Sequence, residues 1–269
     1  MKLCRFQPLV FALPESRQPV ESHPAPRFGR VEDCEIQELT GNFSAGFAPG
    51  RERWPLDDVQ LLPPSVPSKI VCVGRNYRAH ASELGNELPK EPLIFFKPPS
   101  SIIAAGEPIL LPPVSHRVDY EGELAVVIGK RCSQLPDSES AKPYIFGYSC
   151  LNDVTARDLQ NFDGQWTRAK GFDTFCPFGP LIETGLDLAS AVLETRVNGI
   201  RKQCATPSEM IFSLDVIIRW ISRVMTLEPG DVIATGTPAG VCPLSAGDVV
   251  EVEVTGIGTL RNPVQSWPV

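Results

Sequence analysis

The sequence has no apolar run that approaches the ~18 to 20 residues of a membrane-spanning helix. Lys and Arg are also scarce, with 25 of them against 32 Asp and Glu and a net charge of -7. Because phosphate backbones and anionic lipids select basic surfaces, this balance argues against nucleic-acid and membrane partners. We therefore expect partners that are small molecules, metals or other proteins.

The eight cysteines form no C-x-x-C pair and no spacing typical of a zinc site. Most have apolar neighbours, as in "IVCVG" and "GYSCLND", which predicts buried free thiols in a reducing cytoplasm rather than a disulfide framework. Histidine is scarcer, with three residues. His23 and His116 lie in proline-rich stretches and are expected at the surface, which leaves His80 as the candidate for chemistry.

Proline, by contrast, is abundant at 27 residues and clusters in "LLPPSVPSK", just before the apolar run "IVCVG". Such a cluster is typical of a linker, because proline cannot donate to a strand ladder. The cluster predicts a small N-terminal α+β domain over residues 1–67 and a main domain over residues 68–269. A chain of 269 residues is long enough to bury a sizeable core.

Short strands dominate the main domain, because its apolar segments are bounded by Gly, Pro, Asn or Asp. The expected strands are 69–74, 92–97, 122–129, 145–153, 193–199, 231–236 and 248–256. Helices are expected over 207–225, where Thr206 and Glu209 form a capping box, and over 76–85, with Asn76 as cap. The fold class is therefore α+β and β-dominated.

Two glutamates enter the strand predicted at 122–129. Residues i and i+2 of a strand share a face about 7 Å apart, where two carboxylates repel by roughly 2 kcal/mol at a dielectric of about 20. Glu251 and Glu253 have the same spacing and are expected to face solvent, so Glu121 and Glu123 have that explanation too. The alternative is a hard divalent metal with oxygen ligands, since the strand that follows them looks buried on both faces.

Four further residues have both a chemical and an ordinary explanation. Asp153 ends an apolar strand, as a third metal ligand or as a helix cap. Glu83 lies three residues after His80, where it either orients the imidazole or forms an exposed pair. Lys170 stands among aromatic residues, to neutralise a substrate anion or as a surface lysine. Thr237 lies on a tight turn, which either binds an anion or is simply a turn.

Six segments, taken together and in order, resemble the fumarylacetoacetate hydrolase family. They are "VGRNYRAHASELG", "FFKPPSSI", "DYEGELAVVIGK", "GYSCLNDVTARDLQ", "RAKGFDTFCPFGP" and "GDVIATGTPAGV". The resemblance covers about residues 69 to 265, and residues 1–67 resemble the small variable domain that some members carry. It implies a mixed β-sandwich roll of the family's C-terminal type, usually assembled as a homodimer.

The resemblance also implies roles for individual residues. The implied metal ligands, for Mg²⁺ or Mn²⁺ and sometimes Ca²⁺, are Glu121, Glu123 and Asp153. The implied catalytic residues are the dyad His80 and Glu83, on a segment that orders over the substrate, and Lys170 beside the metal. The implied substrate-binding residues are Arg157, Gln160 and Thr237. Asp119, which precedes the glutamates, receives no role.

The implied chemistry is enolate formation from a 2-oxo acid or 1,3-dicarbonyl compound that chelates the metal. We expect a hydrolase that cleaves a C–C bond in acylpyruvate- or fumarylpyruvate-type 2,4-dioxo acids, with His80 deprotonating the attacking water. An isomerase or decarboxylase of 2-oxo or 2-hydroxymuconate-type diacids, such as 5-carboxymethyl-2-hydroxymuconate isomerase or oxaloacetate decarboxylase, is the alternative. A non-catalytic ligand-binding β-domain is disfavoured, because a pure binder has no use for a His–Glu dyad.

Overall fold

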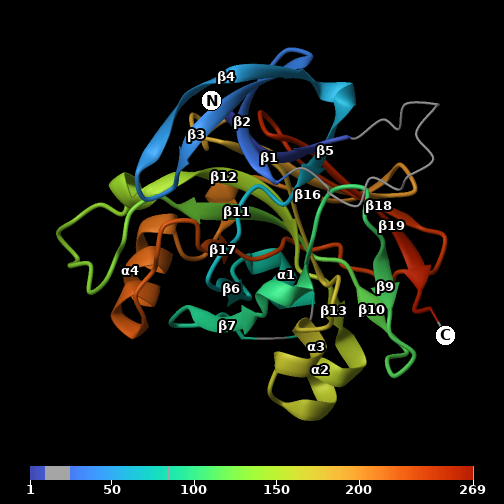
Figure 1. The fold of residues 1–269 in the computed structure, drawn as a ribbon. Helices are drawn as coiled ribbons and strands as arrows, with labels where there is room; N and C mark the ends of the chain where they lie inside the picture. The colour runs from blue at the N-terminus through green and yellow to red at the C-terminus, as the bar shows by residue number, and fades with distance from the viewer. Residues whose placement is uncertain (10–24, 84, 86, 269) are drawn as a thin grey trace.

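The computed structural model describes residues 1–9, 25–83, 85 and 87–268, so the expectation for His23 lies outside the described residues. Strands dominate the chain, which confirms the predicted β-dominated α+β class (Figure 1). A large mixed sheet is built from β1 (Lys2–Pro8), β2 (Arg27–Glu32), β3 (Glu35–Asn42), β4 (Gly46–Pro55), β5 (Val59–Leu62), β6 (Ile70–Gly74), β7 (Leu93–Lys97), β8 (Ile102–Ile103), β11 (Gly122–Ile128), β12 (Ile145–Asn152), β14 (Cys176–Glu183) and β17 (Val232–Ala234).

The large sheet runs in the order β4-β3-β2-β1-β14-β12-β11-β17-β6-β7, with β5 paired to β1 and β8 to β14. A second sheet, in the order β16-β15-β18-β19-β9, contains β9 (Ile109–Leu111), β15 (Leu193–Val197), β16 (Ile200–Ala205), β18 (Val249–Val254) and β19 (Gly258–Ser266). A short ribbon pairs β10 (Val118–Asp119) with β13 (Thr155–Ala156). Each of the seven strands expected from the sequence is present.

The helical elements are few and short. They are α1 (Arg78–Glu83), α2 (Arg157–Asp163), α3 (Thr167–Lys170) and α4 (Leu214–Val224), with 3₁₀ turns η1 (Leu56–Asp58), η2 (Pro99–Ser101), η3 (Lys142–Tyr144) and η4 (Pro207–Glu209). In Figure 1, α1 lies beside β6, and α2 and α3 lie below β6 and β7, which end the large sheet. None of the described helices is long and apolar enough to cross a membrane.

Strand β11 is buried along its whole length, as its unbroken apolar run predicts. Its residues Leu124 and Val126 belong to the core between the two sheets, together with Val252 of β18. Ala125 and Val127, which alternate with them, belong to a second core on the opposite face of the large sheet. The two sheets thus form the sandwich that the resemblance implies, and β11 runs through its middle.

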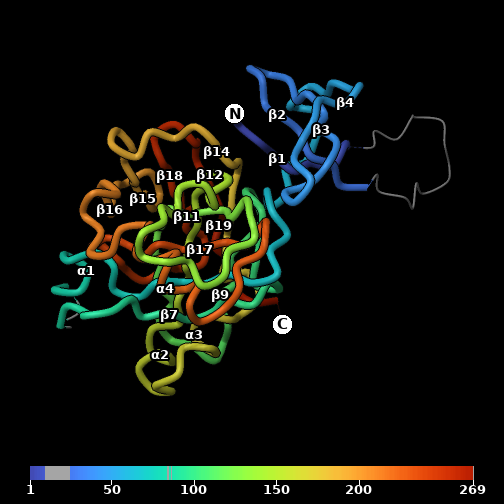
Figure 2. The backbone as a smooth tube through the Cα atoms, turned by 90° about the vertical axis from the view of Figure 1, so that its left-hand side faces the viewer, coloured from blue at the N-terminus to red at the C-terminus, as the bar shows by residue number. Residues whose placement is uncertain are grey.

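The N-terminal strands β1 to β4 stand to one side of the rest of the molecule (Figure 2). They continue the large sheet, because β1 pairs antiparallel with β14 through Lys2 opposite Glu183 and Leu3 opposite Ile182. The linker after β5 is fixed by buried Asp231, whose Oδ1 accepts the Ser68 hydroxyl at 2.7 Å. The division of the chain near residue 68 stays a prediction.

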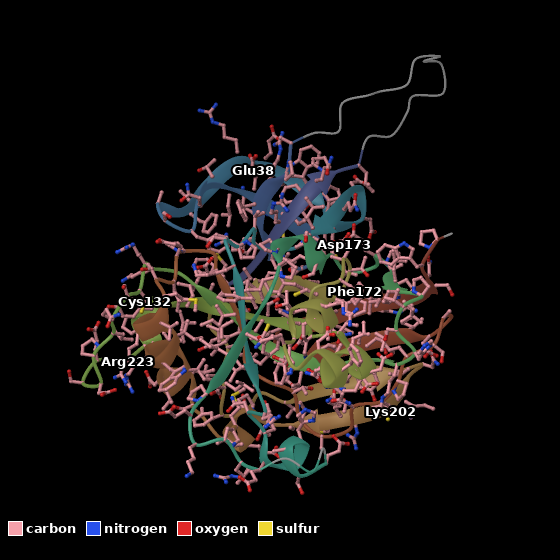
Figure 3. The ribbon with its side chains drawn as sticks, turned by 90° about the horizontal axis from the view of Figure 1, so that it is seen from below. Glu38, Cys132, Phe172, Asp173, Lys202 and Arg223 are labelled. Atoms are coloured by element: carbon pink, nitrogen blue, oxygen red, sulfur yellow. The ribbon has the colours of Figure 1, made fainter. Side chains whose placement is uncertain are left out.

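The helix expected over 207–225 starts later than predicted. The capping box at Thr206 exists, but it caps only η4. The true helix, α4, begins after Ser213, whose hydroxyl accepts the N–H of Val216. Its polar side, which carries Arg223, faces outward (Figure 3).

The break before α4 has a physical cause in Asn76. The backbone N–H of Ile211 donates to the Asn76 carbonyl at 2.7 Å, and that of Phe212 donates to the Asn76 side chain at 2.8 Å. The Asn76 amide in turn donates to the Thr235 carbonyl at 2.8 Å. Asn76 was expected to cap α1; it instead ties the 211–212 segment to the turn after β17. The three hydrogen bonds of Asn76 therefore account for both errors.

Candidate metal centre and substrate pocket

The pairing of β11 with β12 brings three carboxylates together. Gly122 lies opposite Asn152, so Glu121 and Asp153 flank the same end of the strand pair. The Asp153 N–H donates to the Glu121 carbonyl at 2.8 Å, which fixes the two backbones. One oxygen from each of Glu121, Glu123 and Asp153 lies within 4.8 Å of the others, and all three residues are buried. Asp153 is therefore not a helix cap.

Two buried lysines neutralise part of this negative charge. Lys170 donates to Glu121 at 2.7 Å and to Asp153 at 2.6 Å. Lys97, at the end of β7, donates to the other Asp153 oxygen at 2.7 Å and to the Val154 carbonyl at 3.0 Å. Both lysines are 1 to 2% exposed, so Lys170 is not a snorkelling surface residue. Burial lowers the pKa of Lys170, but Asp153 and Glu121 outweigh burial and raise it above its usual value.

Glu123 is the carboxylate with no cation of its own. No Lys, Arg or His among the described residues forms an ion pair with it, and its hydrogen bond is from the Gly236 N–H at 2.7 Å. Burial, with Asp153 and Glu121 nearby, raises the pKa of Glu123 well above its usual value. Burial also acts on Glu121, but Lys170 and Arg157 lower its pKa below the usual value. The cluster therefore lacks a positive charge next to Glu123.

Asp119 acquires a role that the sequence did not assign. It is fully buried on β10, and its carboxylate accepts the Nε–H of Arg157 and the Nε–H of Arg117, each at 3.0 Å. Arg157 also donates to Glu121 at 2.5 Å and to Gln160 at 2.7 Å. Asp119 thus orients the guanidinium that holds Glu121. Because Arg157 lies 38 residues after Asp119 in the sequence, only the folded chain reveals this contact.

The predicted pair of His80 and Glu83 forms on α1. Nδ1 of His80 lies 3.4 Å from Oε2 of Glu83. His80 is buried, with 5% of its surface exposed, whereas Glu83 is exposed to solvent. The Gly240 N–H donates to both Glu83 oxygens at 3.0 and 3.2 Å, and the Gly240 carbonyl accepts the Tyr120 hydroxyl at 2.6 Å. The turn after β17 therefore orients the carboxylate that orients the imidazole.

These groups share one pocket of about 420 Å³. Its walls come from segments far apart in the sequence. The residues that line it are Val73, Gly74, Arg75, His80, Phe95, Arg117, Glu121, Glu123, Asp153, Arg157, Gln160, Asn161, Trp166, Lys170 and Thr237. The Lys170 ammonium lies 5.0 Å from the centre of the Phe95 ring, and Phe95 packs edge-on against Trp166. The pocket thus has an acidic floor beside an aromatic wall.

Thr237 shapes the wall rather than presenting a free hydroxyl. Its hydroxyl donates to the Gly122 carbonyl at 2.8 Å and accepts the Gln203 amide at 2.8 Å. Gln203 also accepts the N–H of Gly122, the residue between the two glutamates, at 3.0 Å. The carboxylate segment is therefore fixed to the turn after β17 by two side chains.

The structure brings together all nine residues that the sequence singled out for the site, namely His80, Glu83, Glu121, Glu123, Asp153, Arg157, Gln160, Lys170 and Thr237. Eight of them line the pocket. Glu83 does not line it but contacts His80, which does. Sequence reasoning missed Lys97 and Asp119. The quoted "FFKPPSSI" motif contains Lys97, and its position on an apolar strand was the signal available. His116 is exposed, as expected.

The comparison pair Glu251 and Glu253 differs from the expectation. The two side chains are half-buried on β18, and Arg196 of the neighbouring strand β15 forms ion pairs with both. Cross-strand arginine therefore compensates their repulsion, rather than water alone. Glu123 has no such arginine, and this difference separates the two E-x-E motifs.

The residues fit a hard divalent cation. Three buried carboxylates whose oxygens converge within 4.8 Å supply the oxygen donors that Mg²⁺ and Mn²⁺ prefer, and Glu123 lacks a compensating charge. Bound there, a divalent ion would be held by Glu121, Glu123 and Asp153. Lys97, Lys170 and Arg157 would remain as hydrogen-bond donors that fix the orientation of these ligands.

Known families and proteins match the chain along nearly its whole length. A family model described as "Fumarylacetoacetate (FAA) hydrolase C-terminal" matches residues 69–265, and one described as "Rv2993c-like, N-terminal" matches residues 21–64. The structure of 5-carboxymethyl-2-hydroxymuconate delta-isomerase from Mycobacterium smegmatis is 42% identical, with a TM-score of 0.87 over 99% of this chain and 100% of that chain.

Two further relatives are named for different reactions. Oxaloacetate tautomerase YisK of Bacillus subtilis is 41% identical over 230 residues, which span 80% of this chain and 76% of YisK. Maleylpyruvate hydrolase from Sphingobium sp. SYK-6, solved with manganese(II) and pyruvate, is 30% identical, with a TM-score of 0.77 over 100% of both chains. The related proteins are thus named as an isomerase, a tautomerase and a hydrolase.

Proposed function

Because this chain belongs to the family of the fumarylacetoacetate hydrolase C-terminal domain, we propose that it is a divalent-metal-dependent hydrolase of 2,4-dioxo acids of the acylpyruvate or fumarylpyruvate type. The observation that carries the proposal is one shared pocket. It holds three buried carboxylates, a buried lysine and a histidine oriented by a glutamate. Mg²⁺ or Mn²⁺ is the proposed cofactor, in keeping with the manganese of the related maleylpyruvate hydrolase.

A bound divalent ion supplies Lewis-acid polarisation of the adjacent oxygens of a 2-oxo acid. The residues of the chain supply the proton transfers. With Nδ1–H directed at Glu83, the other ring nitrogen of His80 is free to take a proton from water in the pocket. The hydroxide oxygen bonds to the distal carbonyl carbon, and the C–C bond on its inner side breaks. The electron pair of that bond stays on the pyruvate fragment as an enolate, which is then protonated.

Lys170 is placed to stabilise the leaving fragment. Two of its three N–H groups are taken by Glu121 and Asp153, and the third is available to an oxygen that gains charge. Because Lys170 is buried against Phe95, a charge-assisted hydrogen bond there is stronger than in water. The products are pyruvate and the carboxylic acid that contains the distal carbonyl.

An isomerase, tautomerase or decarboxylase of 2-oxo diacids is the second proposal. The relatives named for isomerisation and tautomerisation favour it. The same groups serve it: in isomerisation or tautomerisation His80 moves a proton on the substrate itself, and in decarboxylation CO₂ leaves and the enolate that remains is protonated. No water is consumed in either case. The two proposals differ in whether water enters the product.

An assay panel separates the two proposals. Purified protein with Mg²⁺ or Mn²⁺ is given acetylpyruvate, fumarylpyruvate, oxaloacetate and 5-carboxymethyl-2-hydroxymuconate, and products are identified by NMR in H₂¹⁸O. Hydrolysis predicts pyruvate and ¹⁸O in the released acid, with turnover lowered about 100-fold or more in His80→Ala. Full turnover in His80→Ala, or no pyruvate from any dioxo acid, contradicts the hydrolase proposal. An isomerised product with its carbon skeleton intact, or CO₂ released without a second carboxylic acid, supports the second.

A further inference from the structure

One guanidinium in the pocket has no partner. Arg75 is half-buried and lines the pocket, yet its side chain makes no ion pair or hydrogen bond with any residue in the described part of the chain. The other cations of the pocket wall are engaged: Arg117 by Asp119, and Arg157 and Lys170 by the carboxylate cluster. Arg75 therefore offers N–H donors that none of the described residues uses.

The backbone holds Arg75 in a conformation that arginine rarely adopts. Strand β6 ends at Gly74, and Arg75 follows with a φ of 59°, in the left-handed region that disfavours side chains with a Cβ. The next residue, Asn76, is locked by its bonds to Phe212 and Thr235. The segment is thus fixed on both sides of a strained residue, and such residues cluster at ligand sites.

The wall next to Arg75 is apolar. A Cβ added at Gly74 would lie 2.9 Å from the Trp166 ring, so the indole packs directly against the backbone there. Trp166 in turn packs against Phe95, with ring centroids 5.1 Å apart. A ligand that reaches from the carboxylate cluster to Arg75 passes this aromatic surface, which suits a short carbon chain between two polar ends.

We propose that Arg75 binds a second, distal carboxylate of the substrate, so that the pocket selects 2-oxo diacids over 2-oxo monoacids of equal length. The fork of guanidinium N–H groups matches a carboxylate with two parallel hydrogen bonds. The inference rests on the proposed function for the 2-oxo acid end that the metal site receives. It favours fumarylpyruvate-type substrates over acylpyruvates with an uncharged tail.

Binding of two matched ligands tests this role without turnover. 2-Oxoglutarate and 2-oxopentanoate share a five-carbon chain and a 2-oxo acid end, and differ in the distal carboxylate. Calorimetry with Mn²⁺-loaded protein is expected to give a Kd about tenfold or more lower for 2-oxoglutarate, in line with a charge-assisted hydrogen bond. In Arg75→Met the two Kd values are expected to agree within about twofold, and Arg75→Lys is expected to restore part of the preference.

Arg78 provides the matched control, because it is an exposed arginine on α1 that does not line the pocket. Arg78→Met is expected to keep the wild-type ratio. Equal Kd values in the wild-type protein, or an unchanged ratio in Arg75→Met, would overturn the assignment. Equal Kd values in the wild-type protein overturn the proposal even if a variant misfolds. A preserved ratio with no turnover of any dioxo acid would sink the proposed reaction while leaving the diacid subsite intact.

Discussion

Glu123 and Asp153 belong to the same buried cluster but differ in their cation partners. Asp153 accepts hydrogen bonds from Lys97 and Lys170, whereas Glu123 has none from a cation. A buried ion pair that loses one partner leaves the other charge uncompensated, while removal of an uncompensated carboxylate relieves a desolvation cost. Replacing each carboxylate by the corresponding amide is therefore expected to have opposite effects on the stability of the metal-free protein.

The first prediction compares Glu123→Gln with Asp153→Asn in the metal-free protein. Glu123→Gln keeps an oxygen for the Gly236 N–H, so its free energy of unfolding is expected to stay level or rise. Asp153→Asn leaves two buried ammonium groups without their shared partner and is expected to lose about 3 kcal/mol. Urea unfolding after metal removal measures both.

Metal binding supplies the second half of that test. Both variants are expected to lose Mn²⁺ affinity, by about 100-fold or more, because each removes a carboxylate oxygen from a three-carboxylate site. Calorimetric titration with Mn²⁺ measures the loss. A Glu123→Gln protein that binds Mn²⁺ like the wild type, or that unfolds more easily than Asp153→Asn, contradicts this account of the cluster.

At the scale of elements, the turn between β17 and residue 240 joins the dyad to the carboxylates. Gly240 adopts a φ of 107°, and a Cβ there would lie 2.1 Å from the Lys202 carbonyl. Its N–H holds Glu83, and Gly236 in the same turn holds Glu123. A shift of this turn therefore reaches both the base and a metal ligand.

Gly240→Ala is expected to lower turnover about tenfold or more, because the displaced N–H no longer orients Glu83 and hence His80. Gly247 is the matched control: its φ of 96° imposes similar backbone strain, but nothing lies within 4 Å of an added Cβ. Gly247→Ala is expected to cost about 1 kcal/mol of stability with unchanged kcat. Equal activity losses in the two variants, measured beside urea unfolding, would refute the role of the turn.

The sequence predicts elements well where the apolar pattern and the turn residues agree. The seven expected strands are present for this reason, and β14 (Cys176–Glu183) was missed because Pro177 and Pro180 argue against a strand. The helix start was misplaced because the capping box at Thr206 is a local signal. The contact of Asn76 with Phe212 that overrides it spans 136 residues.

The site residues also divide into those with a local sequence signal and those fixed by contacts between distant segments. Glu121, Glu123 and the His80–Glu83 pair were accessible because short spacings and a family resemblance mark them. Lys97 was not, because it stands 56 residues from Asp153, which it neutralises, and its place at the end of an apolar strand is a weak local signal. Asp119 was left without a role for a similar reason, since its partner Arg157 is 38 residues away.

At the scale of the whole molecule, the fold separates the cysteines into buried and exposed thiols. Five of the eight cysteines are buried, which confirms the expectation for most of them, and all eight are free; the exposed ones are Cys34, Cys204 and Cys242. The homodimer and the cytoplasmic location stay predictions. The buried free thiols nevertheless make the free energy of unfolding depend on pH to a measurable extent.

Burial raises the pKa of Cys4, Cys150 and Cys176 to about 12, from the usual thiol value of 9.0. The folded protein therefore keeps these protons at a pH where the unfolded chain releases them. Their contribution to stability is complete below about pH 9 and is lost as the pH rises toward about 12, with a slope of at most about 1.4 kcal/mol per pH unit for each thiol.

Urea unfolding in a phosphine reductant at pH 7, 8, 9 and 10 is expected to show a level free energy of unfolding up to about pH 9 and a lower value at pH 10. Cys150→Ala is expected to make that decline less steep, because the variant lacks one of the thiols whose pKa is raised.

At pH 8, a disulfide reagent is expected to modify three thiols in the folded protein and eight in denaturant. Rapid modification of all eight thiols in the native state would contradict the burial that causes the pH dependence, because any thiol that the reagent can reach is also accessible to water.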